Sequence, residues 1–153
     1  MKICLVTSGG GHLFHLYMLK QWWSKYDRFW VAPQKDDVIS LLRNERTYWS
    51  YYPVTRNYRN LIRNTLLAPK VLLKEKADLI ISTGGGVAIP FFYMGKLLKA
   101  KLVFIEVLDG IVFPTWTGRV VYPIVDGFFL QMEEQKRFYP KGEVLGKLIG
   151  GLL

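Results

Sequence analysis

Two short glycine-rich segments carry the strongest chemical signal in this sequence. They read Thr7-Ser8-Gly9-Gly10-Gly11-His12 and Ser82-Thr83-Gly84-Gly85-Gly86, and each follows a short apolar run typical of a buried strand. Glycines let backbone N–H groups approach a phosphate at the start of a helix, where the helix dipole also favours an anion. Neither segment has the G-x-G-x-x-G or Gly-Lys-Ser/Thr pattern of dinucleotide and P-loop sites. The segments therefore predict another phosphate-bearing ligand, with tight strand-to-helix turns as the alternative.

Several side chains could act on such a ligand. His12 directly follows the first glycine run, and it could be a general base because the ordinary pKa of histidine, ~6.5, is close to working pH. Capping or packing is its alternative role. Glu106 ends a predicted strand and is a second catalytic candidate, with a solvated strand-end acid as the alternative. Beyond Thr115, which could cap a helix, Thr117 and Arg119 are candidates for phosphate contact, the arginine through its planar guanidinium.

To act together, the two glycine-rich segments need a fold that brings them to the same edge of a sheet. Apolar runs alternate with segments of helical periodicity along the chain, which predicts parallel strands joined by helical crossovers. Ligands bind at the carboxyl ends of the strands in such sheets. We therefore expect a single doubly wound α/β domain. The predicted strands are 2–7, 29–32, 48–52, 79–82, 102–106, 127–130 and 144–145, and the predicted helices are 12–26, 36–46, 58–76 with a kink or split at Pro69, about 87–98, a short one from 115, and a turn at 133–138.

Composition limits the class of protein. Half of the 153 residues are apolar, which favours one globular domain over disorder. The single cysteine, Cys4, excludes an intrachain disulfide, and its apolar surroundings predict a buried strand residue. The apolar run after Lys2 is shorter than the ~7–15 residues of a secretory signal core, and the other runs are shorter than the ~20 residues of a membrane helix. We expect a cytoplasmic protein with peripheral membrane contact, and neither a metal nor a cofactor.

The net charge of +9 is concentrated in one region. Residues 53–77 hold six basic residues against one acid, Glu75, and so carry +5 of that charge. A basic segment can face nucleic acid, anionic lipid or an acidic substrate, but no recognised nucleic-acid module accompanies it, so nucleic acid is not an expected partner. Interleaved apolar residues suit a helix on an anionic membrane, or an amphipathic helix packed on the core. The membrane-surface candidates are Arg56, Arg59, Arg63, Lys70 and Lys74.

Five segments occur in an order that resembles a known family. They are Ser8–His12, Ala77–Gly86, Phe104–Glu106, Thr117–Pro123 with Asp126, and Tyr139-Pro140 followed by Gly146. Together they resemble the PssD-type bacterial polysaccharide subunits. These are relatives of the membrane-anchor subunit of the eukaryotic transferase that adds the second N-acetylglucosamine to dolichol diphosphate.

The resemblance implies the amino-terminal half of a GT-B glycosyltransferase, encoded apart from its donor-binding catalytic subunit. It implies that the chain binds a polyprenyl-diphosphate-sugar acceptor and recruits its partner to the anionic cytoplasmic face of the membrane, in capsule or exopolysaccharide synthesis. A non-catalytic scaffold that activates the partner is the alternative. By the same resemblance His12 lies near the acceptor diphosphate and the reactive hydroxyl, and the substrate-binding candidates are Gly9, Gly10, Gly11, Thr83, Gly84, Gly85, Gly86, Thr117 and Arg119.

Overall fold

The computed structural model describes residues 1–148, and within them the strands form one fully parallel sheet. Its strand order is β3-β2-β1-β4-β5-β6-β7. The predicted doubly wound α/β sheet is therefore confirmed. The strands are β1 (Lys2–Val6), β2 (Asp27–Pro33), β3 (Thr47–Ser50), β4 (Leu79–Ser82), β5 (Lys101–Ile105), β6 (Gly127–Leu130) and β7 (Glu143–Val144).

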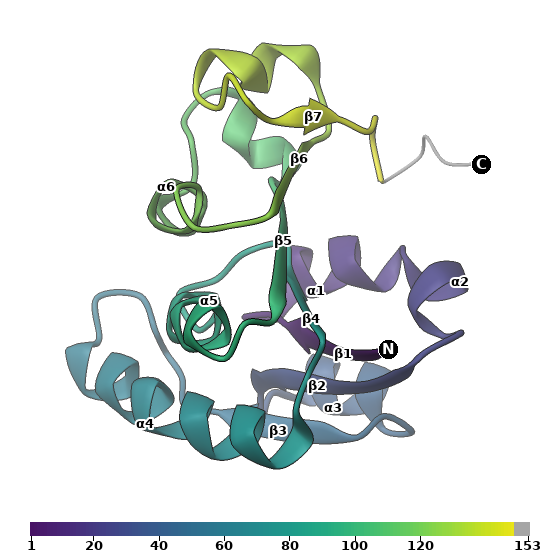
Figure 1. The fold of residues 1–153 in the computed structure, drawn as a ribbon, viewed down its shortest axis with the longest axis vertical. Helices are drawn as coiled ribbons and strands as arrows, with labels where there is room; N and C mark the ends of the chain where they lie inside the picture. The colour runs from purple at the N-terminus through teal and green to yellow at the C-terminus, as the bar shows by residue number, and fades with distance from the viewer. Residues whose placement is uncertain (149–153) are drawn as a thin grey trace.

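Helices cover both faces of this sheet (Figure 1). Since the crossovers bury the central strands on both sides, β1 and β4 are apolar along almost their whole length. In the part of the chain that is described, no helix is both long and apolar enough to cross a membrane. One face carries α1 (Gly10–Tyr17), α2 (Lys20–Trp23) and α3 (Asp36–Leu42). The other face carries α4 (Tyr58–Glu75), α5 (Ala88–Leu97) and α6 (Trp116–Val121). Two short 3-10 helices, η1 (Leu108–Ile111) and η2 (Glu133–Arg137), follow β5 and β6 respectively.

Each face of the sheet buries its own apolar cluster. Along β1 the side chains alternate between them, with Ile3 and Leu5 in the cluster under α1 to α3 and Cys4 and Val6 in the cluster under α4 to α6. This alternation is the period-two geometry of a strand. Cys4 is fully buried, as predicted, and burial raises the pKa of its thiol well above the ordinary value. An uncharged, buried thiol is a packing group rather than a nucleophile.

The predicted helix over residues 12–26 is wrong in one respect, because it is two helices. α1 ends at Tyr17 and α2 begins at Lys20. The indole of Trp23 donates a hydrogen bond of 3.0 Å to the carbonyl of Leu16, and Trp23 also packs edge-on against Trp30 of β2, with 5.4 Å between ring centroids. Burial of the Trp23 side chain in the core therefore favours the break between α1 and α2 over a continuous helix.

The basic helix α4 agrees with the predicted helix over residues 58–76, except that Pro69 does not split it. It runs unbroken from Tyr58 to Glu75 with Pro69 inside it, so the expected split does not occur. Pro69 lacks the N–H that would bond to the fourth residue before it, but α4 is anchored by packing of its buried face against the sheet, where Ala68, Val71 and Leu72 join the core. Tertiary packing outweighs the cost of one missing hydrogen bond.

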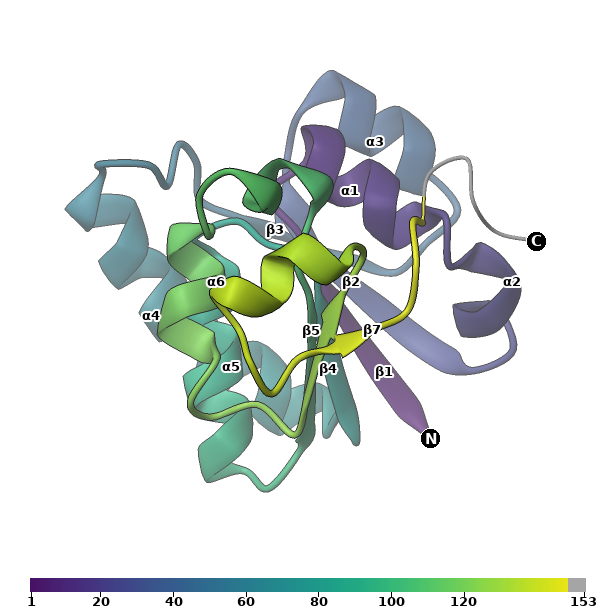
Figure 2. The same cartoon turned by 90° about the horizontal axis from the view of Figure 1, so that it is seen from above.

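The order of the strands places a reversal at the centre of the sheet. From β1 the chain moves outward through β2 and β3, then returns along α4 to β4, which pairs with the other side of β1 before the chain moves away through β5 to β7. The view from above in Figure 2 shows α1 and α5 leaving this centre on opposite faces. Such a switch point at the carboxyl edge is the usual ligand crevice of an open α/β sheet.

Candidate functional site

The two glycine-rich loops meet at this switch point. The ring Nδ1 of His12 lies 2.9 Å from the carbonyl oxygen of Thr83, and the Thr83 hydroxyl donates a 2.6 Å hydrogen bond to the carbonyl of His12. Gly85 has a φ of +96°, and a Cβ there would be 2.3 Å from the Cβ of Ser8. Only glycine accepts this conformation and this approach easily. The second loop is thus shaped to pack against the first.

Two helices begin at these loops without a side-chain cap. α1 starts at Gly10 and α5 at Ala88, and neither receives a capping hydrogen bond from the residue before it. The first amide groups of a helix have no partner within the helix. At the start of α5 the N–H groups of Ala88 and Ile89 already donate to the carbonyls of Gly85 (2.9 Å) and Gly86 (3.3 Å), and Pro90 has no N–H. The N–H groups at the start of α1 and the positive ends of both helix dipoles favour an anion at this edge.

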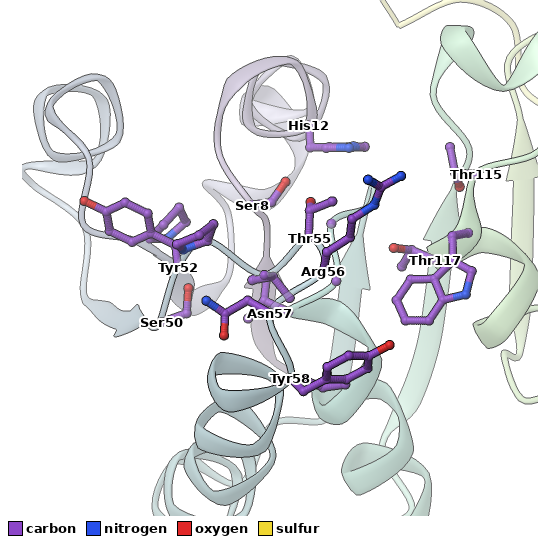
Figure 3. A pocket seen from close by; sticks show the side chains of 18 of the residues that line it. Ser8, His12, Ser50, Tyr52, Thr55, Arg56, Asn57, Tyr58, Thr115 and Thr117 are labelled. Atoms are coloured by element: carbon purple, nitrogen blue, oxygen red, sulfur yellow. The ribbon is translucent and has the colours of Figure 1, made fainter.

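A cavity of about 690 Å³ opens between the loops, the β3–α4 connection and the start of α6 (Figure 3). Its described lining contains His12, Lys35 and Arg56 but no aspartate or glutamate. Two permanent cations without a carboxylate give the cavity a positive potential. The lining therefore suits an anionic ligand such as a phosphate group.

His12 is oriented within this cavity by its hydrogen bond to Thr83. Because a carbonyl oxygen only accepts, Nδ1 of His12 must carry the proton in that bond, which leaves Nε2 of the neutral ring with a free lone pair. Burial lowers the pKa of His12 below 6.5, opposed by the Thr83 carbonyl and by Asp109. A neutral imidazole with an available Nε2 can accept a proton from a ligand hydroxyl.

Glu106 has a different environment from the one expected. It is fully buried, so the solvated alternative is wrong, and it is not part of the cavity lining. The hydroxyls of Thr115 (2.9 Å) and Tyr139 (2.8 Å) and the amide of Val107 (3.1 Å) donate to its carboxyl oxygens. Burial raises the pKa of Glu106 above its ordinary value against these bonds. Since Thr115 also caps α6 through the amide of Gly118, Glu106 positions the helix start that forms one cavity wall.

The surface of α4 carries a stripe of exposed apolar side chains in addition to its buried face. Tyr58, Ile62, Leu66 and Leu73 expose 80%, 61%, 62% and 57% of their surface. Successive residues are turned by about 100° around a helix, so residues that directly follow members of the stripe form a second stripe beside it. Three exposed basic residues, Arg59, Arg63 and Lys74, directly follow members of the apolar stripe, and the exposed Lys70 lies at a similar angle around the helix, so these four form the second stripe.

Comparisons with known proteins give a consistent but distant relationship. No family model matches the chain. It is 33% identical over 81 residues to the UDP-N-acetylglucosamine–N-acetylmuramyl-(pentapeptide) pyrophosphoryl-undecaprenol N-acetylglucosamine transferase of Finegoldia magna, covering 53% of this chain and 21% of that protein. It is 26% identical over 171 residues to the UDP-N-acetylglucosamine transferase subunit ALG14 of Candida albicans, covering 97% of this chain and 78% of that subunit.

A solved structure shows the same fold. The chain superposes on the crystal structure of MurG from Acinetobacter baumannii with a TM-score of 0.74 at 18% identity, covering 95% of this chain and 45% of that one. The chain thus spans less than half of the MurG chain and about a fifth of the Finegoldia protein. This protein has the Rossmann-like fold of the amino-terminal half of GT-B glycosyltransferases and is weakly homologous to ALG14 and to MurG-like transferases.

The structure brings only some of the predicted ligand residues to the cavity. Gly85, Gly86 and Thr117 line it together with His12. Thr83 is fully buried, and its hydroxyl is bonded to the first loop, so it positions His12 instead of facing the cavity. The other candidates, Gly9, Gly10, Gly11, Gly84 and Arg119, are not among the described lining residues.

Sequence reasoning missed the β3–α4 connection. Ser50, Tyr52 and Asn57 line the cavity, yet their segment has no glycine run. One signal was available, because Ser50 lies in a predicted strand whose carboxyl end must reach the same edge as the glycine loops. Arg56 also lines the cavity. It precedes α4, whereas the other four basic residues predicted for the membrane surface lie on that helix.

Proposed function

We propose that this chain is the acceptor-binding, membrane-recruiting subunit of a two-subunit glycosyltransferase that acts on a polyprenyl-diphosphate-linked sugar in capsule or exopolysaccharide synthesis. One observation carries the proposal: the cavity without carboxylates and the apolar stripe of α4 share Tyr58. An anion site therefore opens at the end of an exposed apolar surface. This pairing matches a ligand whose diphosphate is polar and whose polyprenyl chain stays in the bilayer.

The two stripes of α4 support attachment to the cytoplasmic face of the membrane. Apolar side chains such as Ile62 and Leu66 can enter the headgroup boundary, while the neighbouring basic residues contact anionic lipid. With α4 on the bilayer, its amino-terminal end and the cavity lie at the membrane surface. The acceptor diphosphate then reaches the glycine loops without extraction of its lipid tail.

The similarity to a protein that is named as a subunit supports the need for a partner. The chain matches less than half of MurG, and the Candida albicans protein, of which it covers 78%, is named as a subunit of a transferase. We assign residues 1–153 to a single domain of the amino-terminal GT-B type. The donor nucleotide sugar then binds to a second polypeptide, which completes the cleft above the carboxyl edge of this sheet.

His12 is the group that we propose for chemistry. Its Nε2 accepts the proton of the acceptor hydroxyl as that oxygen forms a bond to the anomeric carbon of the donor sugar. The bond from that carbon to the nucleotide diphosphate breaks, and the leaving group keeps the electron pair. The backbone amides at the start of α1, with the cavity cations, hold the acceptor diphosphate during this step.

Charge reversal on α4 tests the membrane part of this proposal. We expect the double variant Arg59→Glu, Arg63→Glu to lose at least about tenfold in affinity for vesicles with anionic lipid, because each basic residue near such a surface contributes ~1 kcal/mol. Co-sedimentation with vesicles measures it. Arg43→Glu is the matched control, since Arg43 is exposed at the end of α3 on the other face of the sheet. Equal binding by the double variant and the control would place α4 in a protein interface.

A further inference from the structure

The β3–α4 loop, residues 51–57, holds a cation that no other group in the described chain neutralises. Arg56 is exposed and lines the cavity, and no carboxylate within residues 1–148 forms a salt bridge with it. Figure 3 shows its guanidinium between His12 on one side and Thr115 and Thr117 on the other. The charge therefore faces the space above the glycine loops, away from the basic stripe of α4.

This loop is fixed in place by side chains of α4. The side-chain amide of Asn64 accepts a hydrogen bond from the backbone N–H of Tyr51 (2.9 Å) and donates one to the backbone carbonyl of Tyr51 (3.0 Å). The side-chain amide of Asn60 donates to the backbone carbonyl of Pro53 (2.9 Å). The side-chain oxygen of Asn57 caps α4 by accepting a hydrogen bond of 3.0 Å from the backbone N–H of Asn60. Two buried asparagines of α4 thus hold the first part of the loop and the half-buried Asn57 holds its end, so the segment that carries Arg56 is fixed on both sides.

A second feature of the same wall indicates a polar ligand. Ser50, the last residue of β3, is 5% exposed and lines the cavity, and its hydroxyl has no hydrogen-bond partner among the described residues. Buried hydroxyl groups are normally paired in folded proteins. An unpaired hydroxyl at a cavity wall is thus available to an oxygen atom of a bound molecule.

We propose that Arg56 binds the diphosphate of the lipid-linked acceptor and forms the outer wall of that site, opposite the two glycine loops. This assignment rests on the proposed function and adds to it a specific residue from a third segment. A guanidinium presents paired N–H donors that match phosphate oxygens. The amino-terminal end of the 18-residue helix α4 lies directly behind it and adds its dipole to those of α1 and α5.

Binding of farnesyl diphosphate and of farnesol to the full chain tests this proposal. We expect wild type to prefer the diphosphate, and Arg56→Ala to weaken diphosphate binding by about tenfold or more, as for a lost charge-assisted hydrogen bond, while farnesol binding is unchanged. Arg56→Lys keeps the charge but not the paired donors, so its affinity should be intermediate. Arg43→Ala is the control that keeps full affinity, and circular dichroism verifies that each variant is folded.

Vesicle co-sedimentation of Arg56→Ala separates the possible results. Retained vesicle binding with weakened diphosphate binding supports the proposal. Unchanged diphosphate binding with weakened vesicle binding overturns it, because Arg56 would then be a membrane contact. The proposed function is tested separately, by whether wild type binds farnesyl diphosphate more tightly than farnesol. If wild type itself does not prefer farnesyl diphosphate to farnesol, both the role of Arg56 and the proposed acceptor are wrong.

Discussion

Replacing His12 by alanine or asparagine should lower the turnover of the proposed two-subunit transferase, once reconstituted, by roughly 100- to 10,000-fold, the range typical for loss of a general base. Asparagine is the sharper variant. Its side-chain amide can still donate to the carbonyl of Thr83, as Nδ1 of His12 does at 2.9 Å, so the contact between the loops is kept while the base is removed. Steady-state kinetics with saturating donor and acceptor measure the effect.

The activity of the proposed transferase with wild-type His12 should depend on pH through the same residue. A base must be unprotonated to act, so activity falls as pH drops through its pKa. Because burial lowers the pKa of His12, this fall should lie below pH 6.5 and should be absent in His12→Asn. Stability changes in the same direction: the lowered pKa values of His12 and His15 mean that the unfolded chain binds more protons below about pH 6.5, so acid also destabilises the fold.

Circular dichroism at each pH therefore accompanies the kinetics. If His12→Asn assembles normally with the partner and keeps wild-type turnover, His12 is not the base. The chain would then act as a scaffold that anchors and activates the catalytic subunit.

Gly85→Ala should be the most damaging single methyl group that can be added to the glycine loops. The new Cβ would lie 2.3 Å from the Cβ of Ser8, at a φ of +96°. Strain of that backbone and overpacking each cost about 1–3 kcal/mol, so we expect a loss of roughly 2–5 kcal/mol in the free energy of unfolding. Denaturant titration measures it, and acceptor binding should fall with it because the loops must separate.

Gly11→Ala is the matched control. A Cβ at Gly11 meets no atom within 4 Å, and Gly11 lies in the first turn of α1, where alanine is the better helix former by up to about 1 kcal/mol. This variant should be as stable as wild type or slightly more stable. Equal unfolding free energies for Gly85→Ala and Gly11→Ala would show that the second loop can move away from Ser8 at little cost.

The elements that sequence patterns locate well are those with strong local signals. The predicted strands 79–82 and 127–130 coincide with β4 and β6, because each is a short apolar run next to a turn. The meeting of the two glycine loops follows from strand order, since parallel strands present their carboxyl ends to one edge. The break between α1 and α2 does not follow, because it depends on where Trp23 packs in the folded core.

The candidate site was less predictable because its residues come from segments far apart in the chain. Glu106 is surrounded by Thr115 and by Tyr139, which lies 33 residues further on, so no local pattern distinguishes it from a strand-end acid at a ligand edge. Arg56 belongs to the same run of basic residues as the α4 stripe, and only the start of α4 at Tyr58 separates the loop from the helix. Charge along the sequence shows how much positive charge is present but not which surface carries it.

Separate titration of the isolated chain with acceptor and donor is the most direct test of its role as the acceptor half. The tryptophan emission of the protein is a suitable probe, because Trp116 lines the cavity. We predict saturable binding of a farnesyl-diphosphate-linked N-acetylglucosamine, no binding of UDP-N-acetylglucosamine, and no sugar transfer until the partner is added. Binding of UDP-N-acetylglucosamine without binding of the lipid diphosphate would show that this chain is the donor half, and transfer by the isolated chain would show that no second subunit is needed.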